Sequence, residues 1–145
     1  MSYLPMFGDE LMLTNHFDWE MSELADRHYS RRTPGTRQFL YSGRKLVLRN
    51  APGTVLFAWL YPDEDKRMDG QAGYNCAMFR NESNRKASEI ILEAEKWAVE
   101  KWGRNRFYTY IDPRKVKGNP PGNCFLRAGW RFERLSKSGQ HLLAK

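Results

Sequence analysis

One stretch of the sequence restricts the fold more than any other: a long amphipathic pattern with a β-favouring run on either side. Apolar residues at positions 87, 90, 91, 94, 97 and 98 form a single helical stripe. Gly103 follows it, where a helix ends well on a left-handed residue. The runs Tyr74–Phe79 and Phe107–Ile111 flank the pattern. The sequence therefore predicts a strand, a helix over Ser83–Trp102 and a second strand.

The rest of the chain adds strands and two further helices, in an order typical of an α+β protein with a mixed sheet and helices on its faces. We expect one domain over residues 1–145. The expected elements are a strand at Leu11–Thr14, a helix capped by Asp18 that stops by Thr33-Pro34-Gly35, strands at Arg37–Tyr41, Lys45–Arg49 and Thr54–Tyr61, a short helix at Asn123–Ala128, and a hairpin of Trp130–Leu135 with His141–Ala144.

The composition of the chain indicates which partners and which cellular compartment to expect. Lysine and arginine number 24 against 17 acidic residues, a net charge of +7 that favours a polyanionic partner, although solubility alone is an alternative. No apolar run is long enough to span a membrane, and the first residues lack a signal-peptide pattern. Cys76 and Cys124 are the only cysteines and indicate a reducing compartment. These features predict a cytoplasmic protein without a metal, since no metal-ligand spacing is present.

The segment from Asn123 to Phe132, Asn-Cys-Phe-Leu-Arg-Ala-Gly-Trp-Arg-Phe, resembles the segment that ends acyltransferases of the GNAT superfamily. There, a helix with an asparagine and an aromatic residue leads through glycine into the penultimate strand. The resemblance implies a mixed, mostly antiparallel sheet flanked by helices. It also implies acetyl-CoA or another acyl-CoA as donor, bound at the unit that runs from Tyr74 to Asp112.

A narrower resemblance is to the Mom-like branch, phage proteins that modify adenine in DNA. It rests on His28-Tyr29-Ser30, Asn81–Glu89, Tyr110-Ile111-Asp112-Pro113 and Gly129-Trp130. This resemblance implies DNA as the acceptor and the cytoplasm of a bacterial host as the location.

The expected donor site lies where the first strand of the central unit leads into the long helix. The N–H groups of a helix start bind anions, and Arg85 and Lys86 add charge for the phosphates of coenzyme A. Two departures from the superfamily stand out: no glycine occurs between Arg80 and Ser88, and Phe125 stands where many members have a tyrosine acid. The predicted donor-binding residues are Asn81, Ser83, Arg85, Lys86, Asn123 and Phe125. The alternative for the start of the long helix is a solvated first turn with ordinary capping. The alternative for Asn123 is a plain N-cap role in the short helix.

The catalytic candidates are Asp112, His28, Tyr29 and Ser88. Asp112 follows a strand, where a carboxylate can reach a cleft and accept a proton from an attacking amine, or can instead bond its own backbone in an Asp-Pro turn. Two tyrosines, Tyr108 and Tyr110, share one side of their strand and either line the cleft or pack in the core. Cys124 begins a helix, a position that lowers a thiol pKa.

The predicted nucleic-acid contacts are cations in two short stretches, Arg31, Arg32, Arg37, Arg114, Lys115 and Lys117. The first hypothesis is acyl transfer to the exocyclic amine of adenine in DNA, which requires a flipped or single-stranded base. The second is acetylation of a small-molecule, peptide or aminoacyl amine. The third is a nucleic-acid-binding module without a reaction, which no zinc-finger, RNP or helix-turn-helix pattern supports. Neither a sequence preference nor an oligomeric state follows from these residues.

Overall fold

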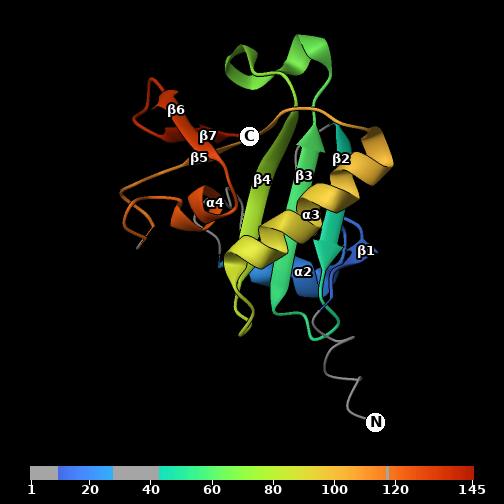
Figure 1. Ribbon diagram of the computed structural model, residues 1–145. Helices are drawn as coiled ribbons and strands as arrows, with labels where there is room; N and C mark the ends of the chain where they lie inside the picture. Colours follow the sequence, from blue (N-terminus) through green and yellow to red (C-terminus); the bar gives the residue numbers. More distant parts are fainter. Residues whose placement is uncertain (1–9, 28–42, 117) are drawn as a thin grey trace.

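A computed structural model describes residues 10–27, 43–116 and 118–145 (Figure 1). Within these residues, seven strands form one sheet in the order β1-β2-β3-β4-β5-β7-β6, and every neighbouring pair is antiparallel except β4 and β5. The elements are β1 (Met12–Thr14), α2 (Trp19–Asp26), β2 (Arg44–Arg49), β3 (Val55–Tyr61), two short 3-10 turns (Glu64–Lys66 and Met68–Gly70), β4 (Tyr74–Asn81), α3 (Ala87–Trp102), β5 (Phe107–Ile111), α4 (Asn123–Arg127), β6 (Arg131–Leu135) and β7 (His141–Ala144).

The helices cover the sheet from both sides, with α3 across the face in front and α2 behind it in Figure 1. The strand between them, β3, is therefore buried on both faces from Val55 to Leu60, which explains its unbroken apolar sequence. The expected α+β fold with a mixed, mostly antiparallel sheet is confirmed. The expected strand at Arg37–Tyr41 lies outside the described residues.

The first helix begins where the sequence predicts and is short. Asp18 is its N-cap and accepts a hydrogen bond from the Met21 backbone N–H at 3.2 Å. A guanidinium nitrogen of Arg49, a largely buried residue of β2, lies 2.9 Å from the same carboxylate. The helix ends at Asp26, before Thr33-Pro34-Gly35, by which the sequence predicts that it stops.

The start of α3 differs from expectation. Lys86 is the N-cap, and within the described residues no side chain caps the helix, which begins at Ala87 and not at Ser83 as expected. The reason is that the Ser83 hydroxyl already accepts a hydrogen bond from the Arg85 N–H at 3.2 Å within the preceding loop. The other end is as predicted, because Gly103 has a φ of 89° and donates its N–H to the Val99 carbonyl.

An aromatic cluster joins the two halves of the sheet on the α3 side. The indole of Trp59, on β3, is stacked on that of Trp130, just ahead of β6, with centroids 6.2 Å apart and planes inclined by 14°. The Phe107 ring, on β5, contacts both indoles. Trp59 and Trp130 are almost fully buried, so this cluster forms the centre of the larger core.

Candidate functional site

The parallel strands β4 and β5 lie side by side, as predicted, but pair over only two positions. Tyr74 is opposite Phe107 and Asn75 is opposite Tyr108, and the pairing ends there. Beyond this point the Thr109 hydroxyl donates to the Cys76 carbonyl at 2.9 Å. A continuing ladder would satisfy that carbonyl with a backbone N–H of β5, so a side chain closes the ladder where the strands separate.

A β-bulge lies next to this separation, on the other edge of β4. Ala58 of β3 is opposite Met78, and Trp59 is opposite Cys76, so Ala77 is an extra residue without a partner on β3. A bulge bends its strand and increases its twist. The bulge at Ala77 therefore accounts for the direction in which β4 leaves β5, and Figure 1 shows β4 and β5 diverging from their paired ends.

The loop between β4 and α3 is organised by its own side chains in place of glycines. The Asn81 amide donates to the Arg85 carbonyl at 2.9 Å, and its oxygen accepts from the Ser83 N–H at 3.0 Å and from the Ser83 hydroxyl at 2.5 Å. The loop leads into the first turn of α3, where Ser88 lies and where no side chain of the described residues caps the N–H groups. Unsatisfied N–H groups and the helix dipole make such a turn a site for an anion.

The two predicted phosphate-binding cations differ in availability. The Arg85 guanidinium, in the loop ahead of α3, lies 2.9 Å from the carboxylate of Glu93 in α3 and is mostly shielded from solvent. The other oxygen of Glu93 accepts the Leu11 backbone N–H at 2.6 Å. Lys86 is exposed and forms no ion pair within the described part of the chain. Lys86 is thus the cation at this turn that can meet an anion without breaking an existing pair.

Asp112, at the end of β5, caps its own turn. Its side chain is buried and accepts the Arg114 backbone N–H at 3.0 Å, while the Arg114 guanidinium lies 3.1 and 3.3 Å from the two carboxylate oxygens. The hydrogen bonds from Arg114 hold the pKa of Asp112 below its ordinary value. This geometry favours the Asp-Pro turn and makes Asp112 a weak base.

The short helix α4 contacts α3 and β6, and the glycine that precedes it lies close to β5 and β7. Its N-cap is Gly122, so Asn123 is the first helical residue and the plain N-cap alternative for it is wrong. Gly122 has a φ of 73°, and an added Cβ would lie 2.5 Å from the Leu143 side chain and 3.1 Å from that of Ile111. The position therefore requires glycine.

Phe125 and Cys124, on α4, both face the core side of this helix. The Phe125 ring is 4.8 Å from the Trp130 ring and 6.1 Å from that of Phe79, on β4, with edge-to-face geometry. Its ring therefore reaches β4 across the side on which β5 has separated. Burial raises the pKa of the Cys124 thiol, so the expected lowering at a helix start is wrong. A five-residue helix contributes too small a dipole to offset that burial.

The tyrosines of β5 share a face, as predicted, which is the face opposite α3. Tyr108 is fully buried and clusters with Leu142 and Ala144 of β7. The Tyr110 hydroxyl donates to Asp69 of the β3–β4 loop at 3.2 Å, and the Arg134 guanidinium is bonded to the same carboxylate. Burial, followed by the nearby Asp69 charge, raises the pKa of Tyr110 to about 12.

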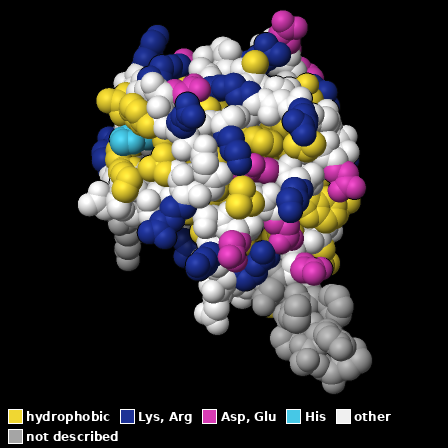
Figure 2. Space-filling model, viewed as in Figure 1, with side chains coloured by type: hydrophobic (Ala, Val, Ile, Leu, Met, Phe, Trp, Pro, Cys, Tyr) yellow, Lys and Arg dark blue, Asp and Glu magenta, His cyan; other side chains and the backbone are white. Residues whose placement is uncertain are grey.

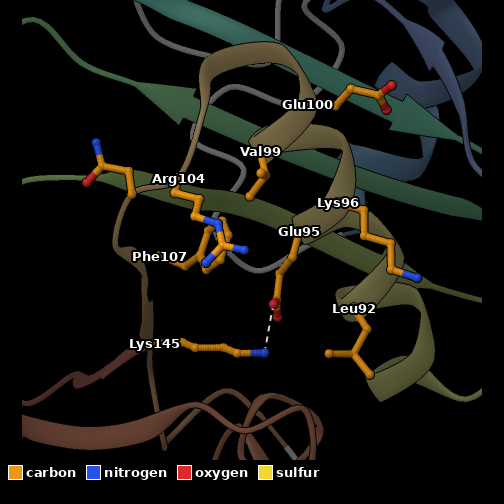
Figure 3. A pocket seen from close by; sticks show the side chains of 9 residues that line it. Leu92, Glu95, Lys96, Val99, Glu100, Arg104, Phe107 and Lys145 are labelled. Atoms are coloured by element: carbon orange, nitrogen blue, oxygen red, sulfur yellow. Dashed lines mark hydrogen bonds and ion pairs between the residues drawn. The ribbon is translucent and has the colours of Figure 1, made fainter.

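A pocket of about 640 Å³ lies between the second half of α3 and the start of β5 (Figure 3). Glu95 points from α3 toward Lys145, whose ammonium is 2.8 Å away, and accepts the Trp130 indole N–H at 2.9 Å. Sequence reasoning missed this site. The feature of the sequence that could have revealed this site is Glu95, a carboxylate between the buried positions Ile91 and Ala98 of the apolar stripe.

Several predicted residues cannot be placed: His28, Tyr29, Arg31, Arg32, Arg37 and Lys117 lie outside the described residues. Arg114 and Lys115 are exposed beyond β5. Figure 2 shows lysine and arginine side chains spread over the face that carries α3, with acidic side chains among them. Over the described ranges, no three His, Cys, Asp or Glu side chains are grouped to hold a metal ion. Of the helices described, none is long and apolar enough to cross a bilayer.

Together, the mixed seven-stranded sheet, the diverging parallel pair and the helix between its strands define a GNAT-like fold. A solved structure with the description "Putative GnaT-family acetyltransferase from Bordetella pertussis" is similar to this chain, with a TM-score of 0.56 and 14% sequence identity, over 94% of this chain and 95% of the other. Neither a protein-family model nor a curated protein matches the sequence. At this identity the similarity concerns the fold.

Proposed function

We propose that this protein is an acyltransferase that uses an acyl-CoA donor. The observation that carries the proposal is the separation of β4 from β5 beside the uncapped first turn of α3. An acyl-CoA is a long molecule with phosphates at one end, amide groups along its arm and a thioester at the other end. The first turn of α3 suits the phosphates, and the backbone edges that β4 and β5 expose after two residue pairs suit the amides.

The parts of the site then have distinct tasks. Lys86 and the N–H groups at the start of α3 bind phosphate. Asn81 and Ser83 act by holding the loop in shape, since their polar groups are bonded within it. The Phe125 ring, which contacts Phe79 across the separation, packs against the donor arm. Asn123 lies beside it and supplies an amide for the same arm.

The chemistry required is modest: an amine attacks the thioester carbon, the thiolate leaves, and one proton moves from nitrogen to sulfur or solvent. Phe125 cannot supply that proton, because its ring has no hydroxyl. The low pKa of Asp112 makes it a poor acceptor for the proton of the amine. His28, Tyr29 and Ser88 remain predicted catalytic residues, and Asp112 is better suited to shaping the turn that follows β5.

For the acceptor we propose the exocyclic amine of adenine in DNA. The net charge of +7 supports a polyanion, and so do exposed Arg114 and Lys115, which follow β5 directly. The resemblance of the segments around Tyr29, Asn81 and Asp112 to Mom-like proteins supports adenine in particular. We place the reaction in the cytoplasm, where acyl-CoA is available and where the free cysteines Cys76 and Cys124 stay reduced.

The donor assignment is tested by thermal denaturation with and without coenzyme A. Coenzyme A at millimolar concentration should raise the melting temperature, because a ligand that binds only the native state stabilises it. Lys86→Glu should remove most of the shift, whereas Lys96→Glu, an equal charge reversal at an exposed position of the same helix, should preserve it. An unchanged melting temperature in the wild type would refute the donor assignment.

The acceptor assignment is tested by mass spectrometry of nucleosides from DNA incubated with the protein and acetyl-CoA. A new adenosine-derived mass that requires both components supports adenine as the acceptor. Binding of single-stranded DNA should weaken steeply with salt, as expected for phosphate contacts. If coenzyme A binds but DNA is neither bound nor modified, the acceptor is a small-molecule, peptide or aminoacyl amine, the other acceptor class considered from the sequence.

A further inference from the structure

The hydroxyl groups of Tyr108 and Tyr110 differ in their hydrogen bonding, although both side chains lie on the same face of β5. The Tyr110 hydroxyl, at the partly exposed end of the strand, is bonded to Asp69. The Tyr108 hydroxyl is fully buried and has no hydrogen-bond partner among the residues that the structure describes. A buried hydroxyl without a partner has lost its bonds to water and gained none from the protein, so it destabilises the folded state relative to a phenylalanine ring.

Tyr108 occupies the position at which β4 and β5 separate. It is opposite Asn75 in the last residue pair between the two strands, and the next residue, Thr109, closes the ladder through Cys76. Its side chain lies on the face opposite α3, because Phe107 and Ile111, one and three residues away, belong to the core under that helix. Tyr108 is therefore the last paired residue of β5, and its side chain lies on the face of the sheet opposite α3.

Cationic groups border this position. The Arg106 guanidinium lies over the Tyr108 ring, 5.3 Å from its centroid. Arg67, in the loop between β3 and β4, is near enough for its charge to lower the pKa of Tyr108, although burial outweighs both cations and leaves that pKa raised. The phenol therefore stays protonated and neutral at physiological pH, able both to donate a hydrogen bond and to accept one.

We propose that Tyr108 is a binding residue for the acyl acceptor, whose amine occupies the open hydrogen-bonding positions of its hydroxyl where β4 and β5 separate. This inference rests on the proposed acyltransferase function. An amine N–H donates to the phenolic oxygen, and its lone pair remains free for attack on the thioester at the same point. No proton is transferred to or from Tyr108, because its role is to orient the nucleophile.

The test compares Tyr108→Phe with Tyr110→Phe, a matched control that removes the same atom two residues away on the same face. Three quantities are measured for each protein: the melting temperature without ligand, its shift on addition of coenzyme A, and the rate of thiol release from acetyl-CoA. Thiol release is measured with single-stranded oligodeoxyadenylate and with a peptide that has a free N-terminal amine.

For Tyr108→Phe, we expect a melting temperature equal to or above that of the wild type, an unchanged coenzyme A shift, and a loss of at least about tenfold in kcat/KM with the acceptor that the wild type uses. Tyr110→Phe should lower the melting temperature, because it removes the bond to Asp69, and should largely retain transfer.

A Tyr108→Phe protein that melts below the wild type would mean that the hydroxyl has a structural partner, and full transfer by this variant would mean that it does not contact the acceptor. Either result overturns the inference while leaving the donor assignment intact. The absence of a coenzyme A shift in the wild type refutes the proposed function instead, and with it the role of Tyr108. A wild type that binds coenzyme A but acylates neither probe counts against an acceptor site at Tyr108.

Discussion

The substitution Thr109→Val tests whether a side chain closes the ladder between β4 and β5. Thr109 is 4% exposed, and its hydroxyl is the described partner of the Cys76 carbonyl on that side of β4. Valine has nearly the same shape, so the packing is preserved and only the hydrogen bond is lost. The variant leaves a buried carbonyl without a partner, which costs about 1–3 kcal/mol. For a chain of this size, a loss near 2 kcal/mol lowers the melting temperature by about 6 °C.

The assay is urea denaturation followed by circular dichroism, with Thr109→Ser as the control. Serine keeps the hydroxyl and loses one buried methyl group, so it should cost about 1 kcal/mol and less than valine. If valine is as stable as the wild type, or if serine is the more destabilising substitution, the Cys76 carbonyl finds another partner. The ladder would then not end in the way described.

Three further predictions follow from local geometry. Gly73→Ala should cost about 3 kcal/mol or more in urea denaturation, because Gly73 has a φ of +116° and its added Cβ would meet the Arg106 carbonyl oxygen. Asp112→Asn should be less stable than the wild type at pH 7. That difference should disappear as the pH falls below 3.8, because Arg114 lowers the folded-state pKa of the carboxyl and its stabilisation is lost on protonation. Cys124 should react with iodoacetamide far more slowly in the native protein than in urea, as measured by mass spectrometry, since burial keeps its thiol protonated.

The sequence was most informative where one periodicity dominates. The stripe of α3 and the β-favouring runs of β4 and β5 on either side of it were enough to predict a strand–helix–strand unit. The adjacency of β4 and β5 followed from that unit. The two-residue extent of their pairing did not, because it depends on the bulge at Ala77, and an extra residue leaves no mark in a run such as Cys-Ala-Met.

Side-chain partners were harder to predict than elements. Asp112 is a plausible base in the sequence, but Arg114, two residues away, satisfies it in a local turn. Arg85 is a plausible phosphate ligand, but it pairs with Glu93 of the helix that follows it, eight residues further along the chain. Short-range partners of this kind compete with every role that a charged residue suggests in isolation. Whether Tyr108 lines the cleft or only packs in the core similarly depends on the partners of one hydroxyl group. The pattern of residue types in the sequence does not reveal those partners.

The stacked indoles of Trp59 and Trp130 give the molecule a built-in optical reporter. The two chromophores are 6.2 Å apart and nearly parallel, so their electronic transitions couple and should produce a strong near-ultraviolet circular dichroism band. Trp59 belongs to the half of the sheet formed by β1–β4, and Trp130 precedes a strand of the other half. The intensity of this band therefore measures how the two halves are oriented. A molecule wedged between β4 and β5 would change it without any label on the protein.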